Sequence, residues 1–265
     1  SMPNADIENQ LQTEGLSQLQ GWIERTFAFR DEMGSVELPL GFFTNVVSVG
    51  RNMGIAFATD GVGTKILVAQ RMHKWDTVGI DCVAMNVNDI LCVGADPLAM
   101  VDYIAVQESD PVILGELAKG LCAGAEMAQI SIPGGEVARV PEMLRGHDGA
   151  VAFDLVGSCI GVLPLNRILV GQDISDGDVV VGLRSSGVHS NGFTLVRRIF
   201  FDQLGGEHDR DVDELGRTIG EELLEPTRIY VREVLQMLDE GLSIKALAHI
   251  TGDGMLNLKR FQSDA

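Results

Sequence analysis

The sequence predicts an α/β (α+β) fold with two domains, and three observations support this prediction. Short segments rich in β-branched residues interleave with longer segments of helical periodicity along the chain. The 265 residues, 45% of them hydrophobic, are enough to bury a core in one large domain or two modest ones. A short Pro-Leu-Asn linker at 164–166 is the predicted boundary between an N-terminal domain, residues 1–165, and a C-terminal domain, residues 166–265.

The first half of the chain contains clear boundary signals. Arg51-Asn52 separates two apolar runs as in a β-hairpin, Gly94-Ala95-Asp96-Pro97 is a strong helix stop, and Asp110-Pro111 supplies an N-cap followed by proline. In chain order we expect a helix starting within 5–33, strands at 46–49 and 54–59, helices at 64–72 and 77–93, a strand at 98–106, a helix at 110–130 and a strand at 151–163. Gly134-Gly135 is expected to break the chain before a polar stretch that ends at 148.

The second half gives weaker signals. The acidic stretch 207–225 contains little core material, and Pro226 is a candidate helix start. The expected elements, in order, are a strand at 178–183, a helix at 191–200, a helix from Pro226 to 238, a strand at 244–250 and a turn at 251–254.

Composition excludes several classes of function. With 20 basic and 38 acidic residues, the net charge of −18 disfavours binding to nucleic acids and to anionic membranes. No apolar run approaches the ~20 residues that span a bilayer, and the N-terminus lacks the pattern of a signal peptide. The four cysteines match no metal-binding spacing, so we expect buried free thiols in a reducing, cytoplasmic compartment.

The segment 59–65, Thr-Asp-Gly-Val-Gly-Thr-Lys, follows a predicted strand and precedes a predicted helix. Gly61 and Gly63 allow close backbone approach to a ligand, and N–H groups at a helix start favour phosphate. Lys65 adds a cation, and Asp60 offers the oxygen ligands that Mg²⁺ prefers. The alternative is an ordinary turn.

Three further groups of polar residues lie at element junctions or on one helix face. Asp81, Asn88 and Asp89 share an arc of the helix at 77–93; such groups are costly to bury without a partner, unless the arc simply faces water. Glu136 follows a flexible Gly-Gly turn. The loop 185–192 contains hydroxyls, an amide and His189, which has either a catalytic or a structural role.

A last glycine-bearing turn, Thr251-Gly252-Asp253-Gly254, follows a predicted strand and is a candidate phosphate-binding turn. Acidic groups, a lysine and glycine-rich turns, without a catalytic triad, together indicate chemistry on Mg²⁺ and a nucleotide. From the residues alone, we therefore expect an ATP-using enzyme with a small phosphorylated substrate.

The same segments resemble the aminoimidazole ribonucleotide synthetase (phosphoribosylformylglycinamidine cyclo-ligase) family. The similar motifs are TDGVGTK at 59–65, VGIDCVAMNVNDILCVGADPL at 78–98, GGE at 134–136, SSGVHSNGFTLVRRI at 185–199, LLEPTRIYV at 223–231 and AHITGDG at 248–254. The wider superfamily, which includes thiamine-monophosphate kinase, shares the aspartate and glycine positions, whereas the HSNG loop and the ProThrArg segment favour the purine enzyme.

The resemblance implies ATP-dependent closure of the imidazole ring of formylglycinamidine ribonucleotide in purine synthesis, in a homodimer formed through the N-terminal sheet. It implies catalytic roles for Asp60, Lys65 and His189, the last assisting proton transfer, and Mg²⁺ ligands at Asp60, Asp89 and Glu136. The implied ATP- and substrate-binding residues are Gly61, Gly63, Thr64, Asn88, Ser190, Asn191, Thr251, Gly252 and Gly254.

The sequence also departs from the family pattern. Residues 5–45 lack the glycine- and aspartate-containing segment that helps cover the nucleotide, Arg139 replaces an acid after GGE, and Asp253 replaces a glycine in the last turn. The family continues beyond the position of Ala265, so the second domain is expected to be incomplete. Two alternatives follow: a phosphotransferase of the superfamily with another small substrate, or a non-catalytic paralogue.

Overall fold

The structure is a computed structural model that describes residues 3–146, 150–203, 205 and 208–263. Its centre is a five-stranded sheet with the order β1-β2-β5-β3-β4, in which β3 and β4 are parallel and the other neighbours antiparallel. The strands are β1 (Asn45–Gly50), β2 (Met53–Gly61), β3 (Asp96–Val106), β4 (Ser131–Arg139) and β5 (Phe153–Pro164).

Helices and short strands complete the fold. The helices are α1 (Pro3–Glu24), α2 (Ile66–Met72), α3 (Asp76–Leu91), α4 (Pro111–Ala128), α5 (Phe193–Arg197), α6 (Ile219–Leu223) and α7 (Val231–Asp239). The 3₁₀ segments include Gly63–Lys65 and Gly254–Arg260, and a π-helical turn spans Arg198–Gln203. The short strand β6 (Asp211–Val212) pairs with β7 (Arg217–Thr218). In the described residues, no helix is both long and apolar enough to cross a membrane.

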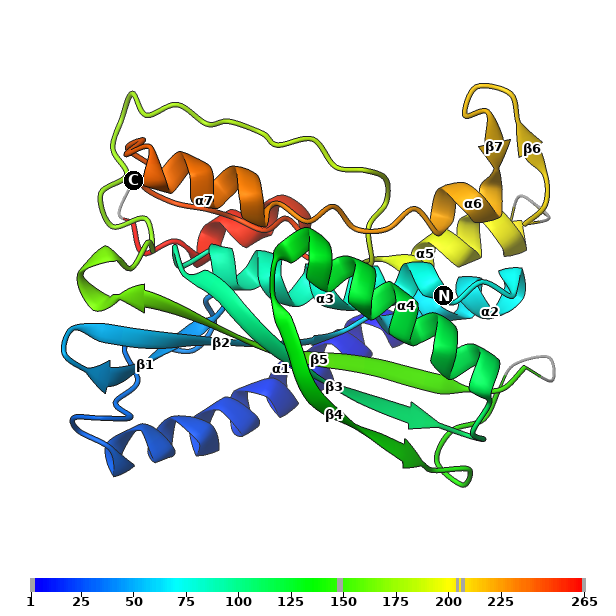
Figure 1. The fold of residues 1–265 in the computed structure, drawn as a ribbon, viewed down its shortest axis with the longest axis horizontal. Coiled ribbons are helices and arrows are strands. Elements are labelled where there is room, and N and C mark those ends of the chain that lie inside the picture. The colour runs from blue at the N-terminus through cyan, green and yellow to red at the C-terminus, as the bar shows by residue number, and fades with distance from the viewer. Residues whose placement is uncertain (1–2, 147–149, 204, 206–207, 264–265) are drawn as a thin grey trace.

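The α3 and α4 helices form a layer between the sheet and the C-terminal helices α5, α6 and α7 (Figure 1). Two glycines allow this close helix pair, because a Cβ at Gly79 would lie 2.5 Å from the backbone nitrogen of Leu121 and one at Gly120 1.8 Å from the carbonyl oxygen of Asp76. Asp110 caps α4 through its side chain, which accepts hydrogen bonds from two backbone N–H groups, as the Asp-Pro signal predicts.

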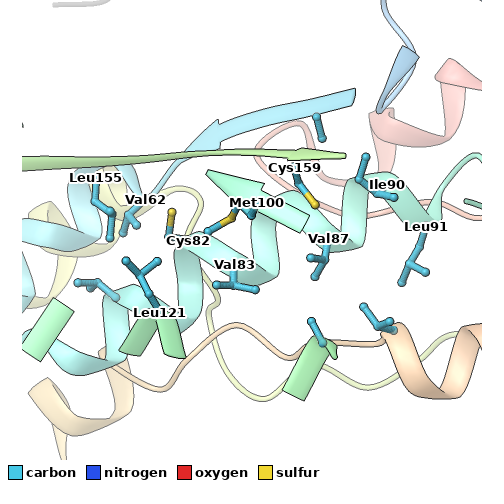
Figure 2. Close-up of a cluster of buried hydrophobic side chains, with 14 of the residues drawn as sticks. Val62, Cys82, Val83, Val87, Ile90, Leu91, Met100, Leu121, Leu155 and Cys159 are labelled. Atoms are coloured by element: carbon cyan, nitrogen blue, oxygen red, sulfur yellow. The ribbon is translucent and has the colours of Figure 1, made fainter. Parts of the chain in front are cut away.

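The core lies on both sides of α3. Figure 2 shows apolar side chains of α3, including Cys82, Val83 and Val87, beside Met100 of β3 and Cys159 of β5. The same buried cluster extends into the second half of the chain, to residues such as Phe193, Ile219, Leu223 and Val234. A helix that is buried on nearly all sides must place its polar residues against partners, and this requirement shapes the candidate site.

Most of the elements expected in the first half are confirmed. The hairpin turn at Arg51-Asn52 has two consecutive residues at positive φ, 54° and 58°, as a tight type I′ hairpin requires. The expected break at Gly134-Gly135 is wrong, because both glycines lie inside β4 and pair with β3. Cys122 is exposed on α4, contrary to the expectation of four buried thiols.

The second half differs more from expectation. Neither 178–183 nor 244–250 forms a strand, and Val179, Val180 and Val181 are exposed, because β-propensity gives a strand only where a neighbouring strand supplies hydrogen bonds. The helix expected from Pro226 begins at Val231, and the one expected at 191–200 is α5 followed by the π-helical turn. The acidic stretch supplies core after all, because Ile219, Leu223 and Leu224 are buried.

Candidate functional site

The polar residues of α3 face the second half of the chain and are paired with it. Asp81 and Asn88 are almost fully buried, so the alternative that this arc faces water is wrong. Asn88 accepts a hydrogen bond from the backbone N–H of Tyr230 (3.2 Å) and donates to the carbonyl of Arg228 (2.9 Å). The sequence predicts that these groups need partners, and much of the pairing comes from chain segments about 140 residues further on.

Lys65 and Asp81 form a buried ion pair. The Lys65 Nζ lies 3.0 Å from Oδ1 and 2.8 Å from Oδ2 of Asp81, and it also donates to the carbonyl of Glu225 (2.7 Å). Burial lowers the pKa of Lys65, and the charge of Asp81 opposes that shift. Both side chains are inaccessible to solvent, so Lys65 is paired within the core in this arrangement, and its expected role beside phosphate stays a prediction.

Asp60 is the penultimate residue of β2 and is hydrogen-bonded to α3. The Asn86 side chain of α3 holds this strand end, since its Oδ1 accepts from the Asp60 backbone N–H (3.0 Å) and its Nδ2 donates to the Asp60 carbonyl (3.2 Å). Gly157, opposite Asp60 on β5, makes room for that amide, because a Cβ there would lie 2.7 Å from Asn86 Nδ2. The Asp60 carboxylate accepts from the Gly61 N–H (2.8 Å), and this is its one hydrogen bond among the residues that the structure describes.

Electrostatics at Asp60 favour an incoming cation. Burial raises the pKa of Asp60, the Gly61 hydrogen bond opposes this shift, and the nearby charge of Asp89 raises the pKa further. Asp89 contacts the buried His249, whose Nδ1 lies 2.8 Å from Oδ1. The sequence alone gave no signal for the Asp89–His249 contact, because the two residues are 160 positions apart.

The loop 185–192 lies against the segment that follows α6. His189 has φ 65°, and its Nε2 accepts hydrogen bonds from the backbone N–H groups of Ser186 (3.3 Å) and Arg228 (3.4 Å). Burial lowers the pKa of His189, with further lowering by His249 and Lys65, so the ring is neutral at pH 7. A neutral ring that accepts at Nε2 carries its proton on Nδ1.

The other predicted binding residues converge on the same region. Asn191 Nδ2 lies 3.8 Å from the sulfur of Met85 on α3, and a Cβ at Gly252 would lie 3.5 Å from Asn191 Oδ1. The Thr64 hydroxyl lies 3.4 Å from that of Thr194 at the start of α5. The structure therefore brings together the 59–65 turn, the loop 185–192 and the 251–254 turn. Within these segments, Gly63 (φ 70°) and Gly254 (φ 57°) use left-handed backbone conformations.

Glu136 is not part of this cluster. Cross-strand pairing runs from Asp60 to Gly157, then to Asp102 and to Gly135. Asp60 and Gly135 are thus three strands apart, about 14 Å at ~4.8 Å per strand. Glu136 follows Gly135 in β4, so its side chain lies on the face of the sheet opposite to that of Asp60.

The predicted trio of metal ligands, Asp60, Asp89 and Glu136, is consequently not assembled within one chain. Among the residues that the structure describes, no three His, Cys, Asp or Glu side chains are close enough to hold a metal ion.

Two of the departures from the family motifs, Arg139 and Asp253, have clear positions in the structure. Arg139 is exposed at the end of β4. Asp253 is exposed, and its Oδ2 lies 3.1 Å from Nη2 of Arg260, so its added negative charge is partly offset. A cavity of about 580 Å³ lies between the 225–229 segment and the helices α3 and α4, and Ser186 of the loop 185–192 also lines it.

Comparisons with known proteins agree with the motifs. Residues 44–163 match the family AIR synthase related protein, N-terminal domain, and residues 175–259 match AIR synthase related protein, C-terminal domain. The fold resembles solved structures of AaThiL complexed with AMPPCP and TMP (TM-score 0.57, 16% identity, 83% of this chain and 61% of that one) and of thiamine-monophosphate kinase from Stenotrophomonas maltophilia (TM-score 0.52, 18% identity, 80% and 61%).

Curated relatives are more similar in sequence. The chain is 50% identical to the phosphoribosylformylglycinamidine cyclo-ligase of Methanothermobacter thermautotrophicus, over 84% of this chain and 64% of that protein. It is 45% identical to the enzyme of the same name from Thermococcus gammatolerans, over 97% of this chain and 73% of that protein. It thus spans about two thirds to three quarters of the length of these relatives. With this identity and coverage, the chain belongs to the phosphoribosylformylglycinamidine cyclo-ligase family.

Proposed function

We propose that this chain catalyses the ATP-dependent cyclisation of formylglycinamidine ribonucleotide to aminoimidazole ribonucleotide in purine biosynthesis. The observation that carries the proposal is that the 59–65 turn and the loop 185–192 both contact α3, while the 251–254 turn lies against the loop. These segments meet in a chain that is 45% identical to a curated cyclo-ligase. We keep the division into domains 1–165 and 166–265 as part of this proposal.

The proposed reaction has two steps. The formyl amide oxygen attacks the γ-phosphorus of ATP, which forms a new oxygen–phosphorus bond and releases ADP. A nitrogen of the same substrate then attacks the activated carbon, the carbon–oxygen bond breaks, and inorganic phosphate leaves as the ring closes with loss of a proton. Such phosphoryl transfer needs positioning and electrostatic stabilisation more than covalent chemistry from the protein.

Asp60 and Asp89 are the residues that would hold Mg²⁺ in this proposal. Both offer carboxylate oxygens, the ligands that Mg²⁺ prefers, and the raised pKa of Asp60 reflects burial first and then a neighbouring negative charge. Glu136 does not fit the same ion within one chain, because it lies three strands away. When bound, the ion would neutralise charge on the phosphates of ATP.

Substrate contacts would come from the loop and the turns. His189 holds its exchangeable proton on Nδ1, since Nε2 is occupied by two N–H donors, and Nδ1 is therefore the atom that would donate to the substrate. Ser190 and Asn191 follow on the same loop. Backbone N–H groups of the glycine-bearing turns, Gly61–Thr64 and Thr251–Gly254, would bind phosphate oxygens.

The decisive experiment follows product and ADP together with purified protein, ATP, Mg²⁺ and formylglycinamidine ribonucleotide. We expect one ADP per aminoimidazole ribonucleotide formed. Asp60→Asn should lower turnover by about 100-fold, a loss typical of removing an electrostatic group from a phosphoryl-transfer site. Asp173→Asn is the matched control, because Asp173 is exposed and lies outside the three segments of the proposed site, and it should retain turnover.

Two results would contradict the proposal. ADP formed only with another small acceptor would favour a phosphotransferase of the same superfamily. Absence of both product and ATP binding would favour a non-catalytic paralogue.

We also propose that the protein is a homodimer formed through the face of the five-stranded sheet opposite to α3 and α4, called the open face here. Phe57, Val101 and Tyr103 point to this face and are between 43% and 49% exposed, although each is a large apolar or aromatic side chain. Sedimentation should give a dimer for the native chain and a monomer for Val101→Asp. A native monomer at micromolar concentration would exclude this interface.

We place the protein in the cytoplasm, in line with its free cysteines. Cys82, Cys92 and Cys159 are buried without disulfides, and burial raises the pKa of Cys159 to about 12. Such thiols are suited to a reducing compartment.

A further inference from the structure

The segment 225–228 lies between α3 and the loop 185–192, and it is hydrogen-bonded to both. On the α3 side, the Arg228 carbonyl accepts from Asn88 Nδ2 (2.9 Å), and the Glu225 carbonyl accepts from Nζ of Lys65 (2.7 Å), the partner of Asp81. On the loop side, the Pro226 carbonyl accepts from the Ser186 hydroxyl (2.6 Å), and the Arg228 N–H donates to His189 Nε2 (3.4 Å). The geometry of the loop therefore depends on where this segment sits.

Thr227, at the centre of the segment, is 1% exposed and touches both sides at once. Its backbone N–H and its hydroxyl both donate to Asp81 Oδ1, at 2.7 and 2.6 Å. The same hydroxyl oxygen lies 3.1 Å from the Ser190 hydroxyl. Because the Thr227 proton is directed to the carboxylate, the Ser190 hydroxyl must be the donor to Thr227.

These contacts form a series of hydrogen bonds that runs from the loop into the core, with each hydroxyl donating to the next group. Ser190 donates to Thr227, Thr227 donates to Asp81, and Asp81 is anchored by Lys65. Because the Thr227 hydroxyl donates to the buried Asp81 carboxylate, its oxygen is a stronger acceptor for the Ser190 hydroxyl. A buried chain of this kind fixes distances more tightly than an exposed loop contact.

We infer that Thr227 is a positioning residue, which holds Ser190 and thereby sets the position of His189 and Asn191 relative to α3. The kinetic part of this inference rests on the proposed function, whereas the structural part does not. Thr227 itself makes no contact with the 59–65 turn or with the 251–254 turn among the hydrogen bonds of the described residues.

The test replaces Thr227 with valine, which keeps the side-chain shape and removes the hydroxyl. Asp81 retains Lys65 and the Thr227 N–H, so the protein should fold. We expect kcat to fall by about tenfold, the effect of one buried hydrogen bond to a charged group, while the KM for ATP changes by less than about twofold. Thr227→Ser restores the hydroxyl and should recover most of kcat.

Thr77→Val is the matched control. Thr77 is also a buried threonine that packs against the same layer, at the start of α3, but its hydroxyl has no hydrogen-bond partner within the described part of the chain. This variant should leave kcat, KM and loop exchange unchanged.

Amide hydrogen exchange provides a readout that does not depend on turnover. Peptides covering 185–192 should exchange faster in Thr227→Val than in the native protein, with peptides from β5 and α4 unchanged. Equal behaviour of Thr227→Val and Thr77→Val, or faster exchange throughout the protein, would overturn the inference. If the native protein makes no aminoimidazole ribonucleotide, the proposed function fails, and the exchange pattern still decides whether Thr227 positions the loop.

Discussion

Replacing Lys65 with methionine tests whether the buried Lys65–Asp81 ion pair stabilises the fold where α3 packs against the second half of the chain. Methionine has a similar length and no charge, so the change removes the cation and leaves the Asp81 carboxylate inside the core. Breaking a buried pair from one side costs about 3–5 kcal/mol, because the remaining charge is uncompensated. Asp81 keeps two hydrogen bonds from Thr227, which favours the lower end, about 3 kcal/mol.

The free energy of unfolding is the quantity to measure, by urea denaturation at pH 7 with circular dichroism. A loss of about 3 kcal/mol is a large part of the 5–15 kcal/mol typical of natural proteins, yet it leaves a folded protein to study. Lys74→Met is the matched control, because Lys74 pairs with Asp76 (3.0 Å) with both side chains more than 40% exposed, and it should cost less than about 1 kcal/mol.

A double-mutant cycle with Asp81→Asn separates the pair from its surroundings. We expect the double variant to be less destabilised than the sum of the two single variants by at least about 1 kcal/mol, since the uncompensated charge is gone. The buried ion pair does not stabilise the fold if Lys65→Met lowers the free energy of unfolding no more than Lys74→Met does. The same conclusion follows if the effects of Lys65→Met and Asp81→Asn on the free energy of unfolding are additive.

Two further predictions concern Gly157, which lies opposite Asp60, and His189 in the loop 185–192. Gly157→Ala should destabilise the protein by about 1–3 kcal/mol and lower turnover, because the added Cβ would lie 2.7 Å from the Asn86 amide that holds Asp60. Gly115→Ala, in an open position of α4, should instead stabilise it by about 0.5–1 kcal/mol, and urea denaturation distinguishes the two. The pKa of His189 is lower in the folded protein than in the unfolded chain, so as the pH falls below about 6.5 the unfolded chain takes up the His189 proton more readily. The free energy of unfolding should therefore decline in this pH range, and His189→Asn should make the decline smaller in thermal melts recorded at several pH values. An unchanged pH profile would show that His189 has its ordinary pKa.

Local sequence signals predicted the first half of the fold well. The Arg51-Asn52 turn, the Asp110-Pro111 cap and the long apolar helix at 77–93 each depend on residues close together in sequence, and each is present. The valine-rich segment at 178–183 has equally strong local preference for a strand but remains unpaired in the described structure. Its conformation depends on a neighbouring strand, which no local pattern specifies.

The sequence predicted which residues would carry the chemistry, and it indicated that the polar groups of α3 would need partners if they were buried. The tertiary structure shows which groups these partners are: Lys65 and Thr227 pair with Asp81, and His249 pairs with Asp89. It also placed Glu136 three strands away from Asp60, although all these residues lie in similar glycine-bearing or apolar motifs. The physical reason is that the cost of burying charge is a property of one residue, whereas its compensation comes from groups that chain topology brings together.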